Sequence, residues 1–260
     1  MSQHVRIFLR IFLMTVATLV AALQAGPALA QEDNAHDPFE TFNRAMFQFN
    51  SNLDRAVVRP VAEAYVNIFP EPVRNCVGNV FSNLGDVGNA VNNALQGKFK
   101  EALSDICRLA INSTIGIFGC FDVASAVGLE KHHEDFGQTL GVWGVGSGPY
   151  LVLPLFGPSS VRDGIGFFTL DTRVDVVRNL DHVPTRNELW TVRLVDTRAG
   201  LLSATNLLDS AALDPYVFVR DAYFQRRRNQ IYDGDPPDDP KGGNRTARVE
   251  AAWPYENAAP

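Results

Sequence analysis

The feature that most limits the fold of this chain is a stretch of 26 residues without a charged side chain, from Phe136 to Val161. Six glycines and three prolines interrupt it. The stretch is too apolar for a solvated loop, and its glycines and prolines break any long helix. Irregular backbone next to lipid survives only inside protein or along a cavity, where its N–H and C=O groups are satisfied. We therefore predict a central segment built to contact lipid.

Residues 1–30 have the form of a secretory signal peptide, which predicts export. Arg6 and Arg10 precede an apolar run, and Ala28–Ala30 is a cleavage site of small residues. The whole chain has a formal net charge of −6, and removing the two signal arginines makes it more negative. Nucleic-acid binding needs a positive surface, so that class of partner is excluded.

Apolar periodicity indicates a mainly α fold. Side chains from Met46 to Ile68 recur at steps of three and four, which predicts an amphipathic helix that Pro60 kinks or divides. We expect one helical domain over residues 31–232, with a Gly/Pro-rich irregular central segment and a disordered tail over residues 233–260. Further helices are expected to start at Asp86, at Phe99, at the capping-box sequence Thr185–Glu188 and at Asp214, with a stop at Gln96–Gly97.

The chain has three cysteines, and export would place them where disulfides persist. An odd number allows at most one bond within the chain. Cys107 and Cys120 flank a turn-like segment and are the first choice for a pair, whereas Cys76 lies farther away in the sequence. Three buried thiols that act as small apolar side chains are an equal alternative.

Residues that resemble catalytic or metal-binding motifs do not complete them. Ser147 lacks the glycines two positions to either side that a nucleophile elbow needs. His132–Asp135 are consecutive, so they point in different directions and are better interpreted as a polar cap before the apolar stretch. Arg226–Arg228 are interpreted as a solvated helix end, with a patch for anionic head groups as the alternative. We predict no enzyme, no metal site and no cofactor.

A series of motifs resembles the VacJ/MlaA family in content and order. They span most of residues 37–228, so the match is specific. The motifs are Asp37–Glu40, Phe42–Met46, Val58–Ala62, Arg74–Asn75, the Asn79–Asn93 region, Gln96–Gly97, Asp135–Gly141, Gly146–Tyr150, Leu153–Pro154, Gly157–Pro158, Arg162–Asp163, Asp214–Tyr216 and Arg220–Tyr223.

This resemblance implies a helical, ring-like protein in the inner leaflet of a Gram-negative outer membrane, with an amphipathic channel beside a trimeric porin. Such a protein would remove phospholipid from the outer leaflet and pass it to a periplasmic lipid carrier, without breaking a bond. Many members are lipoproteins, whereas the first cysteine here is Cys76. We therefore expect no lipobox, and attachment through amphipathic helices and porin contact.

We hypothesise that the glycines and prolines of the central stretch line a lipid path, with Ser147 and Tyr150 meeting the head group. A gate is placed at Phe42 and Asn43. The hypothetical path consists of Gly141, Gly144, Gly146, Ser147, Gly148, Pro149, Tyr150, Leu151, Leu153 and Pro154. The alternative is a periplasmic or outer-membrane scaffold or adhesin that docks a protein partner through an apolar surface. A lipid hydrolase, the third choice, would require a reactive serine.

Overall fold

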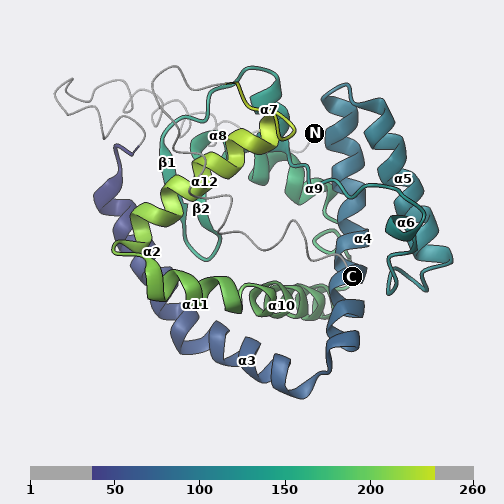
Figure 1. Ribbon diagram of the computed structural model, residues 1–260, viewed down its shortest axis with the longest axis horizontal. Coiled ribbons are helices and arrows are strands. Elements are labelled where there is room, and N and C mark those ends of the chain that lie inside the picture. The colour runs from purple at the N-terminus through teal and green to yellow at the C-terminus, as the bar shows by residue number, and fades with distance from the viewer. Residues whose placement is uncertain (1–36, 238–260) are drawn as a thin grey trace, which may run out of the picture. The chain divides into compact units, whose positions relative to one another are not determined.

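Helices make up most of the chain from residue 37 to residue 237, the part that the computed structural model describes (Figure 1). The predicted mainly α class is confirmed. The signal peptide and residues 238–260 of the expected tail lie outside the described residues. The elements are α2 (Glu40–Leu53), the π-helical turn η2 (Asp54–Val58), α3 (Arg59–Ile68), α4 (Glu71–Leu95), α5 (Phe99–Thr114), α6 (Val123–Ala126), α7 (Phe136–Val142), β1 (Tyr150–Leu153), β2 (Gly157–Ser160), α8 (Val161–Gly166), η3 (Phe167–Asp171, also π-helical), α9 (Thr172–Val174), α10 (Val183–Gly200), α11 (Leu202–Ala211) and α12 (Pro215–Ile231).

The first helical unit is divided where the sequence predicts. A π-helical turn separates α2 from α3, and Pro60 lies in the first turn of α3. A proline is tolerated there because the N–H that it lacks is not needed by the first turn of a helix. The unit ends at Ile68, and Pro70 then caps α4 in an extended conformation.

Helices α4 and α5 pack side by side as a pair (Figure 1). The predicted helix start at Asp86 is wrong, because α4 runs unbroken from Glu71 and Asp86 is a buried residue within it. The predicted stop at Gln96–Gly97 is confirmed. Gly97 has φ +81°, the left-handed conformation that ends many helices and that glycine adopts without steric cost.

A disulfide joins α4 to the turn after α5, and it is not the predicted pair. Cys76 bonds Cys120, whereas Cys107 is free and exposed. Cys107 lies on the outward side of α5. The chain after α5 folds back toward α4, where Asn79 Nδ2 donates to the Cys120 carbonyl at 3.0 Å. Closeness in sequence therefore pointed to the wrong partner, because the helix sets the direction of each side chain.

The charge-free stretch is more regular than its composition suggests. It begins with α7, capped by Asp135, whose carboxylate accepts the Gln138 N–H at 2.9 Å. Of the polar cap expected at His132–Asp135, Asp135 thus caps the helix, whereas the His132 ring bonds Asp105 of α5 at 2.8 Å. After a loop, β1 and β2 form an antiparallel hairpin with Tyr150 opposite Ser160 and Leu153 opposite Gly157.

The C-terminal half folds back onto the N-terminal helices. Helix α10 begins at Val183, before the predicted capping box, because the ring of His182 accepts the Thr185 N–H. Asp214 caps α12 as predicted and accepts the Tyr216 N–H at 3.0 Å. Arg198 of α10 is paired with Asp54 at 2.6 Å, which holds α10 against the first helical unit.

The described elements form a closed series of packing contacts, because α2 continues through η2 into α3, α3 packs on α10, and α10 packs on α4. The hairpin packs on α2 through β1 and on α12 through β2, α12 packs on α7, and α7 packs on α4. The apolar core is small and lies at the hairpin, where Tyr150, Val152 and Tyr216 are buried. None of the helices between residues 37 and 237 combines the length and apolarity needed to cross a bilayer.

Candidate functional site

Two asparagines of α2 hold the free edge of the hairpin. Asn43 donates from Nδ2 to the Tyr150 carbonyl at 3.0 Å and accepts the Val152 N–H at 2.9 Å. One strand step further on, Asn50 donates to the Leu153 carbonyl at 2.9 Å and accepts the Leu155 N–H at 2.8 Å. These side chains satisfy the backbone groups that β2 does not reach. The opening motif of the chain is therefore tied directly to the central stretch.

The hypothetical gate residues differ in their surroundings. Asn43 is fully buried and also donates to Asp37 at 2.7 Å. The structure thus brings Asn43 to the hypothetical lipid path. Phe42, its neighbour on α2, is 49% exposed and is not among the side chains packed on the hairpin core.

The hypothetical lipid-path residues fall into three environments. Gly144, Gly146, Gly148 and Pro154 are exposed, and Ser147, Pro149, Leu151 and Leu153 are half-buried. Tyr150 is fully buried in the core, where it positions the strand and cannot meet a head group directly. Gly141 serves packing instead, because a Cβ there would lie 2.7 Å from Ile231 of α12.

An ionic network anchors α7 and α8 to α12 behind the hairpin. Arg227 donates to both carboxylate oxygens of Asp135 and lies 2.8 Å from Asp163, which also accepts the Tyr223 hydroxyl. Burial alone would raise the pKa of Asp135, but the guanidinium holds it below its usual range. The interpretation of Arg226–Arg228 as a solvated helix end is wrong for Arg227, since the carboxylates of two other helices surround it.

Helices α4 and α5 distribute polar and apolar side chains in the opposite way to a helix pair of a water-soluble protein. Their buried side chains are mostly polar or charged, including Asn83, Asp86 and Asn93 of α4 and Asp105, Arg108 and Asn112 of α5. Their outward side chains include large apolar ones. Buried polar groups are expensive unless they are paired, and soluble helices normally bury their apolar stripe. Such an arrangement is energetically favourable where the outward side chains meet apolar surroundings rather than water.

The polar interior of this pair is largely paired. Arg108 donates to both oxygens of Asp122 at 2.9 and 3.0 Å, and Asn93 donates to Asp105 at 2.8 Å. Desolvation would raise the pKa of Asp122, but hydrogen bonds from Ser125, Asn112 and Arg108 outweigh it and hold the pKa at about 2. Burial raises the pKa of Asp86, even though Lys131 donates to it. Among the described residues, no group of His, Cys, Asp and Glu is arranged to hold a metal ion.

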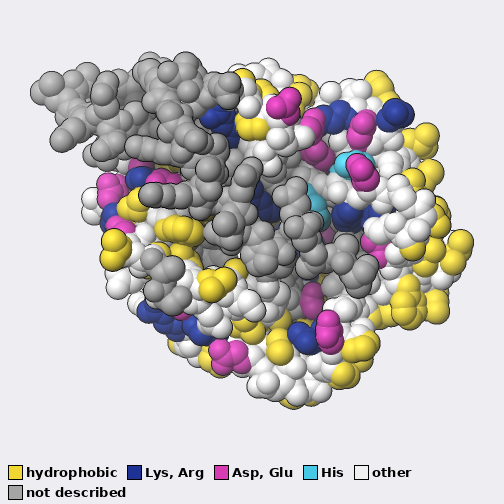
Figure 2. Space-filling view, in the orientation of Figure 1, with side chains coloured by type: hydrophobic (Ala, Val, Ile, Leu, Met, Phe, Trp, Pro, Cys, Tyr) yellow, Lys and Arg dark blue, Asp and Glu magenta, His cyan; other side chains and the backbone are white. Residues whose placement is uncertain are grey.

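The outward side of α5 and the following turn carries seven large exposed apolar side chains, which we term the outer apolar face. Figure 2 shows hydrophobic side chains along the margin occupied by α5 and α6. Its members, with their exposed fractions, are Phe99 (72%), Leu103 (61%), Ile106 (54%), Ile115 (68%), Ile117 (60%), Phe118 (84%) and Phe121 (58%). Large exposed apolar patches mark surfaces that contact membranes or partners.

Three of the exposed apolar side chains sit on strained backbone. Ile117 and Phe118 have φ of +52° and +56°, and Leu155 at the hairpin turn has φ +69° with 59% of its surface exposed. This conformation costs an L-residue about 1–2 kcal/mol, and glycine or asparagine normally occupies it. Bulky apolar residues that are both strained and exposed favour a contact with something outside the folded chain.

Comparison with known proteins identifies the family. The sequence matches the family described as "MlaA lipoprotein" over residues 35–230. The chain belongs to the MlaA lipoprotein family. The predicted resemblance is therefore confirmed. The family is described as one of lipoproteins, which does not support the expectation of a chain without a lipobox; residues 1–36 lie outside the described residues.

Relatives in this family come from several bacteria. The "Intermembrane phospholipid transport system lipoprotein MlaA" of Escherichia coli is 40% identical over 194 residues, covering 73% of this chain and 76% of that protein. The protein of the same name from Haemophilus influenzae is 31% identical over 233 residues, covering 85% and 93%. An uncharacterised protein of Rickettsia bellii is 35% identical over 196 residues, covering 75% and 77%.

A solved structure shares the fold. It is described as "Structural basis for maintenance of bacterial outer membrane lipid asymmetry". Its chain is 38% identical with a TM-score of 0.66, and the match covers 76% of this chain and 99% of the solved chain.

Proposed function

We propose that this protein takes part in maintaining the lipid asymmetry of the outer membrane, by removing phospholipid from the outer leaflet and passing it to a periplasmic carrier. The observation that carries the proposal is the inverted polarity of α4 and α5, which turn polar groups inward and the outer apolar face outward. A seat among acyl chains in the inner leaflet fits this arrangement. The relatives named as phospholipid transport lipoproteins support the pathway.

The outer apolar face is large enough to hold the protein at a bilayer. Complete burial of a large apolar side chain stabilises by about 1.5–3 kcal/mol. The seven side chains of this face are exposed by 54–84%, so transferring them into lipid would yield roughly 7–14 kcal/mol. A single acyl chain supplies only marginal binding, on the order of 10⁴ M⁻¹. In this proposal the outer apolar face alone would hold the protein at the bilayer, and a trimeric porin beside the protein would add a second attachment.

In this proposal the lipid passes along the exposed glycines after α7. Gly144 and Gly146 have open space where a side chain would project, so an acyl chain can approach the backbone closely. Ser147 supplies a polar group, and Leu151 and Leu153 supply half-buried apolar contacts. Asn43 links this path to α2 through its hydrogen bonds to the β1 backbone, and the proposed gate at Phe42 and Asn43 rests on this link.

The proposal is tested by placing a charge on the path. Gly146→Asp introduces a carboxylate where a Cβ meets nothing within 4 Å, so the fold should tolerate it. Gly146→Asn is the matched control, because it adds a side chain of nearly the same size at the same open position without a charge. We expect the Gly146→Asp variant to raise the fraction of phospholipid that an added phospholipase can reach on intact cells. A folded, exported Gly146→Asp protein that clears phospholipid as well as the control would contradict the path.

Purified protein separates the rival functions. Mass spectrometry of lipid extracted from the detergent-purified protein should detect intact phospholipid. A protein that carries no lipid and leaves labelled phospholipid unchanged would favour the scaffold or adhesin. Release of fatty acid from that phospholipid would instead favour a hydrolase.

A further inference from the structure

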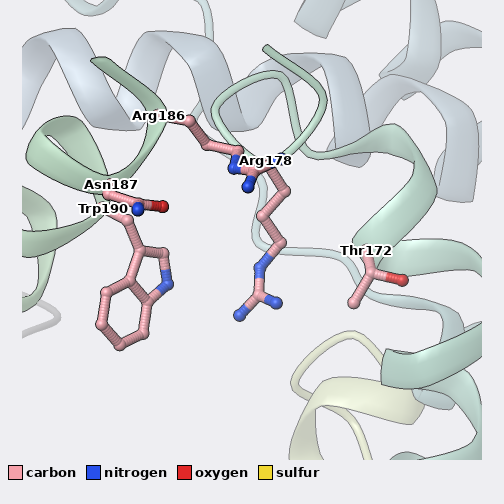
Figure 3. Close-up of a pocket in the computed structure, with 5 residues that line it drawn as sticks. All are labelled: Thr172, Arg178, Arg186, Asn187 and Trp190. Atoms are coloured by element: carbon pink, nitrogen blue, oxygen red, sulfur yellow. The ribbon is translucent and has the colours of Figure 1, made fainter. Parts of the chain in front are cut away.

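A hollow of about 390 Å³ lies between α9 and the first turns of α10. Thr172, Arg178, Arg186, Asn187 and Trp190 line it. Figure 3 shows the Arg178 guanidinium reaching into the space between the Trp190 indole and Thr172. The volume falls within the range of small-molecule sites in proteins, and none of the lining residues is acidic.

The hollow has an excess of positive charge. Asp175, the acidic residue beside it, lies 2.9 Å from Arg193 and 3.7 Å from Arg178. The Asp175 carboxylate also accepts the Val177 N–H at 3.0 Å, so its charge is shared among several donors. Arg186 makes no side-chain hydrogen bond or ion pair within residues 37–237. A guanidinium without a carboxylate partner, facing a hollow, suits an anionic ligand.

Arg178 also joins the hollow to an apolar aromatic surface. Its guanidinium carbon lies 5.0 Å from the ring centroid of Phe167 and 5.7 Å from that of Phe156. Phe168 packs against both rings, and Phe156 and Phe168 are 44% and 57% exposed. One side chain thus borders a cationic hollow on one side and an exposed apolar cluster on the other.

We propose that this hollow binds the phosphodiester of a phospholipid, with the phosphate between Arg178 and Arg186 and the acyl chains on Phe156 and Phe168. The planar guanidinium presents paired N–H groups that match phosphate oxygens. Trp190 packs against the glycerol region with its apolar ring. This inference rests on the proposed function, and it assigns the head group of the transported lipid a place in the fold.

Equilibrium binding to the full-length, detergent-purified protein tests the site. Short-chain dihexanoyl-phosphatidylglycerol, dihexanoylglycerol without phosphate, and inorganic phosphate are titrated separately. Arg186→Gln should weaken binding of the phosphorylated lipid by about tenfold or more, as expected for loss of a charge-assisted contact. It should not change binding of dihexanoylglycerol. Arg173→Gln removes the same charge from exposed α9 outside the hollow and should bind like wild type.

Because Arg178 packs on the aromatic cluster, Arg178→Gln is interpreted only if its melting temperature matches wild type, whereas Arg186→Gln has no such contact to lose. Wild-type affinity in Arg186→Gln would overturn the inference. So would inorganic phosphate that binds as tightly as the lipid with the same dependence on Arg186, which would identify a site for free phosphate. If wild-type protein clears outer-leaflet phospholipid in cells while Arg186→Gln binds normally, only this inference fails. If wild type clears none, the proposed function fails.

Discussion

Replacing both Ile117 and Phe118 by asparagine should raise the free energy of unfolding in water and lower the affinity of the protein for membranes. Both residues have positive φ, which asparagine adopts more readily than a β-branched or aromatic residue. Relief of this strain should stabilise the folded state by about 1–2 kcal/mol for the pair. The same change removes side chains that are 60% and 84% exposed, so about 2–4 kcal/mol of transfer into lipid is lost. That loss corresponds to roughly a 30-fold to 1,000-fold weaker partition into vesicles.

The assay pairs thermal unfolding in detergent-free buffer with flotation on vesicles of phosphatidylethanolamine and phosphatidylglycerol. Thr114→Asn is the control, because it alters an exposed residue beside the same turn without removing a large apolar group. An Ile117→Asn/Phe118→Asn protein that floats like the control would refute the membrane role of the outer apolar face. A protein that loses stability would refute the interpretation of the strain.

Three further predictions concern the hairpin and its supports. Asn43→Ala leaves buried backbone groups of β1 unpaired, so we expect chemical denaturation to show a loss of about 3–5 kcal/mol in the free energy of unfolding. Asn50→Ala, at the more exposed end of the strand, should lower it by less than about 1.5 kcal/mol. Equal losses in the two variants would contradict the anchoring role of Asn43. Burial raises the pKa of Asp171 to about 6, so the protein should lose stability as this carboxyl ionises between about pH 4 and pH 6. Asp171→Asn should raise the free energy of unfolding at pH 7 by about 1–3 kcal/mol and flatten its dependence on pH. A melting-temperature profile that runs parallel to wild type over this pH range would count against this prediction. Gly166→Ala would place a Cβ 2.6 Å from the Gly137 nitrogen, so we expect loss of folded protein by near-ultraviolet circular dichroism, and wild-type spectra and melting would rule out this close approach of α7 and α8.

Local signals in the sequence predicted helix ends well where the chain itself supplies the partner. Gly97 ends α4 because its left-handed conformation depends only on the adjacent backbone. Asp214 caps α12 for the same reason. The predicted cap at Thr185 failed because the ring of His182 accepts the N–H that a serine or threonine side chain would otherwise accept. Capping rules rank side chains by frequency, and an imidazole in this role falls outside them.

Structural features that depend on contacts between distant parts of the sequence could not be predicted. Asp86 resembles a helix cap, but its partners Lys131 and Arg108 come from other segments. The polar stripe from Asn79 to Asn93 recurs at helical spacing, yet periodicity gives two faces of a helix without saying which is buried. The same ambiguity hid the role of Asn50, which no motif distinguishes from a solvated asparagine. The Gly/Pro stretch pointed to a lipid-contacting segment, but the hairpin within it was missed because its strands are only four residues long.

The inverted helix pair has a consequence for the order of assembly. Hydrophobic collapse in water gathers apolar side chains, so it would tend to turn α4 and α5 the wrong way round. The bond between Cys76 of α4 and Cys120, in the turn after α5, holds that turn against α4 covalently and does not depend on lipid. Oxidation would thus favour the arrangement that the proposed seat in a bilayer stabilises, and chains kept reduced should be trapped as aggregates.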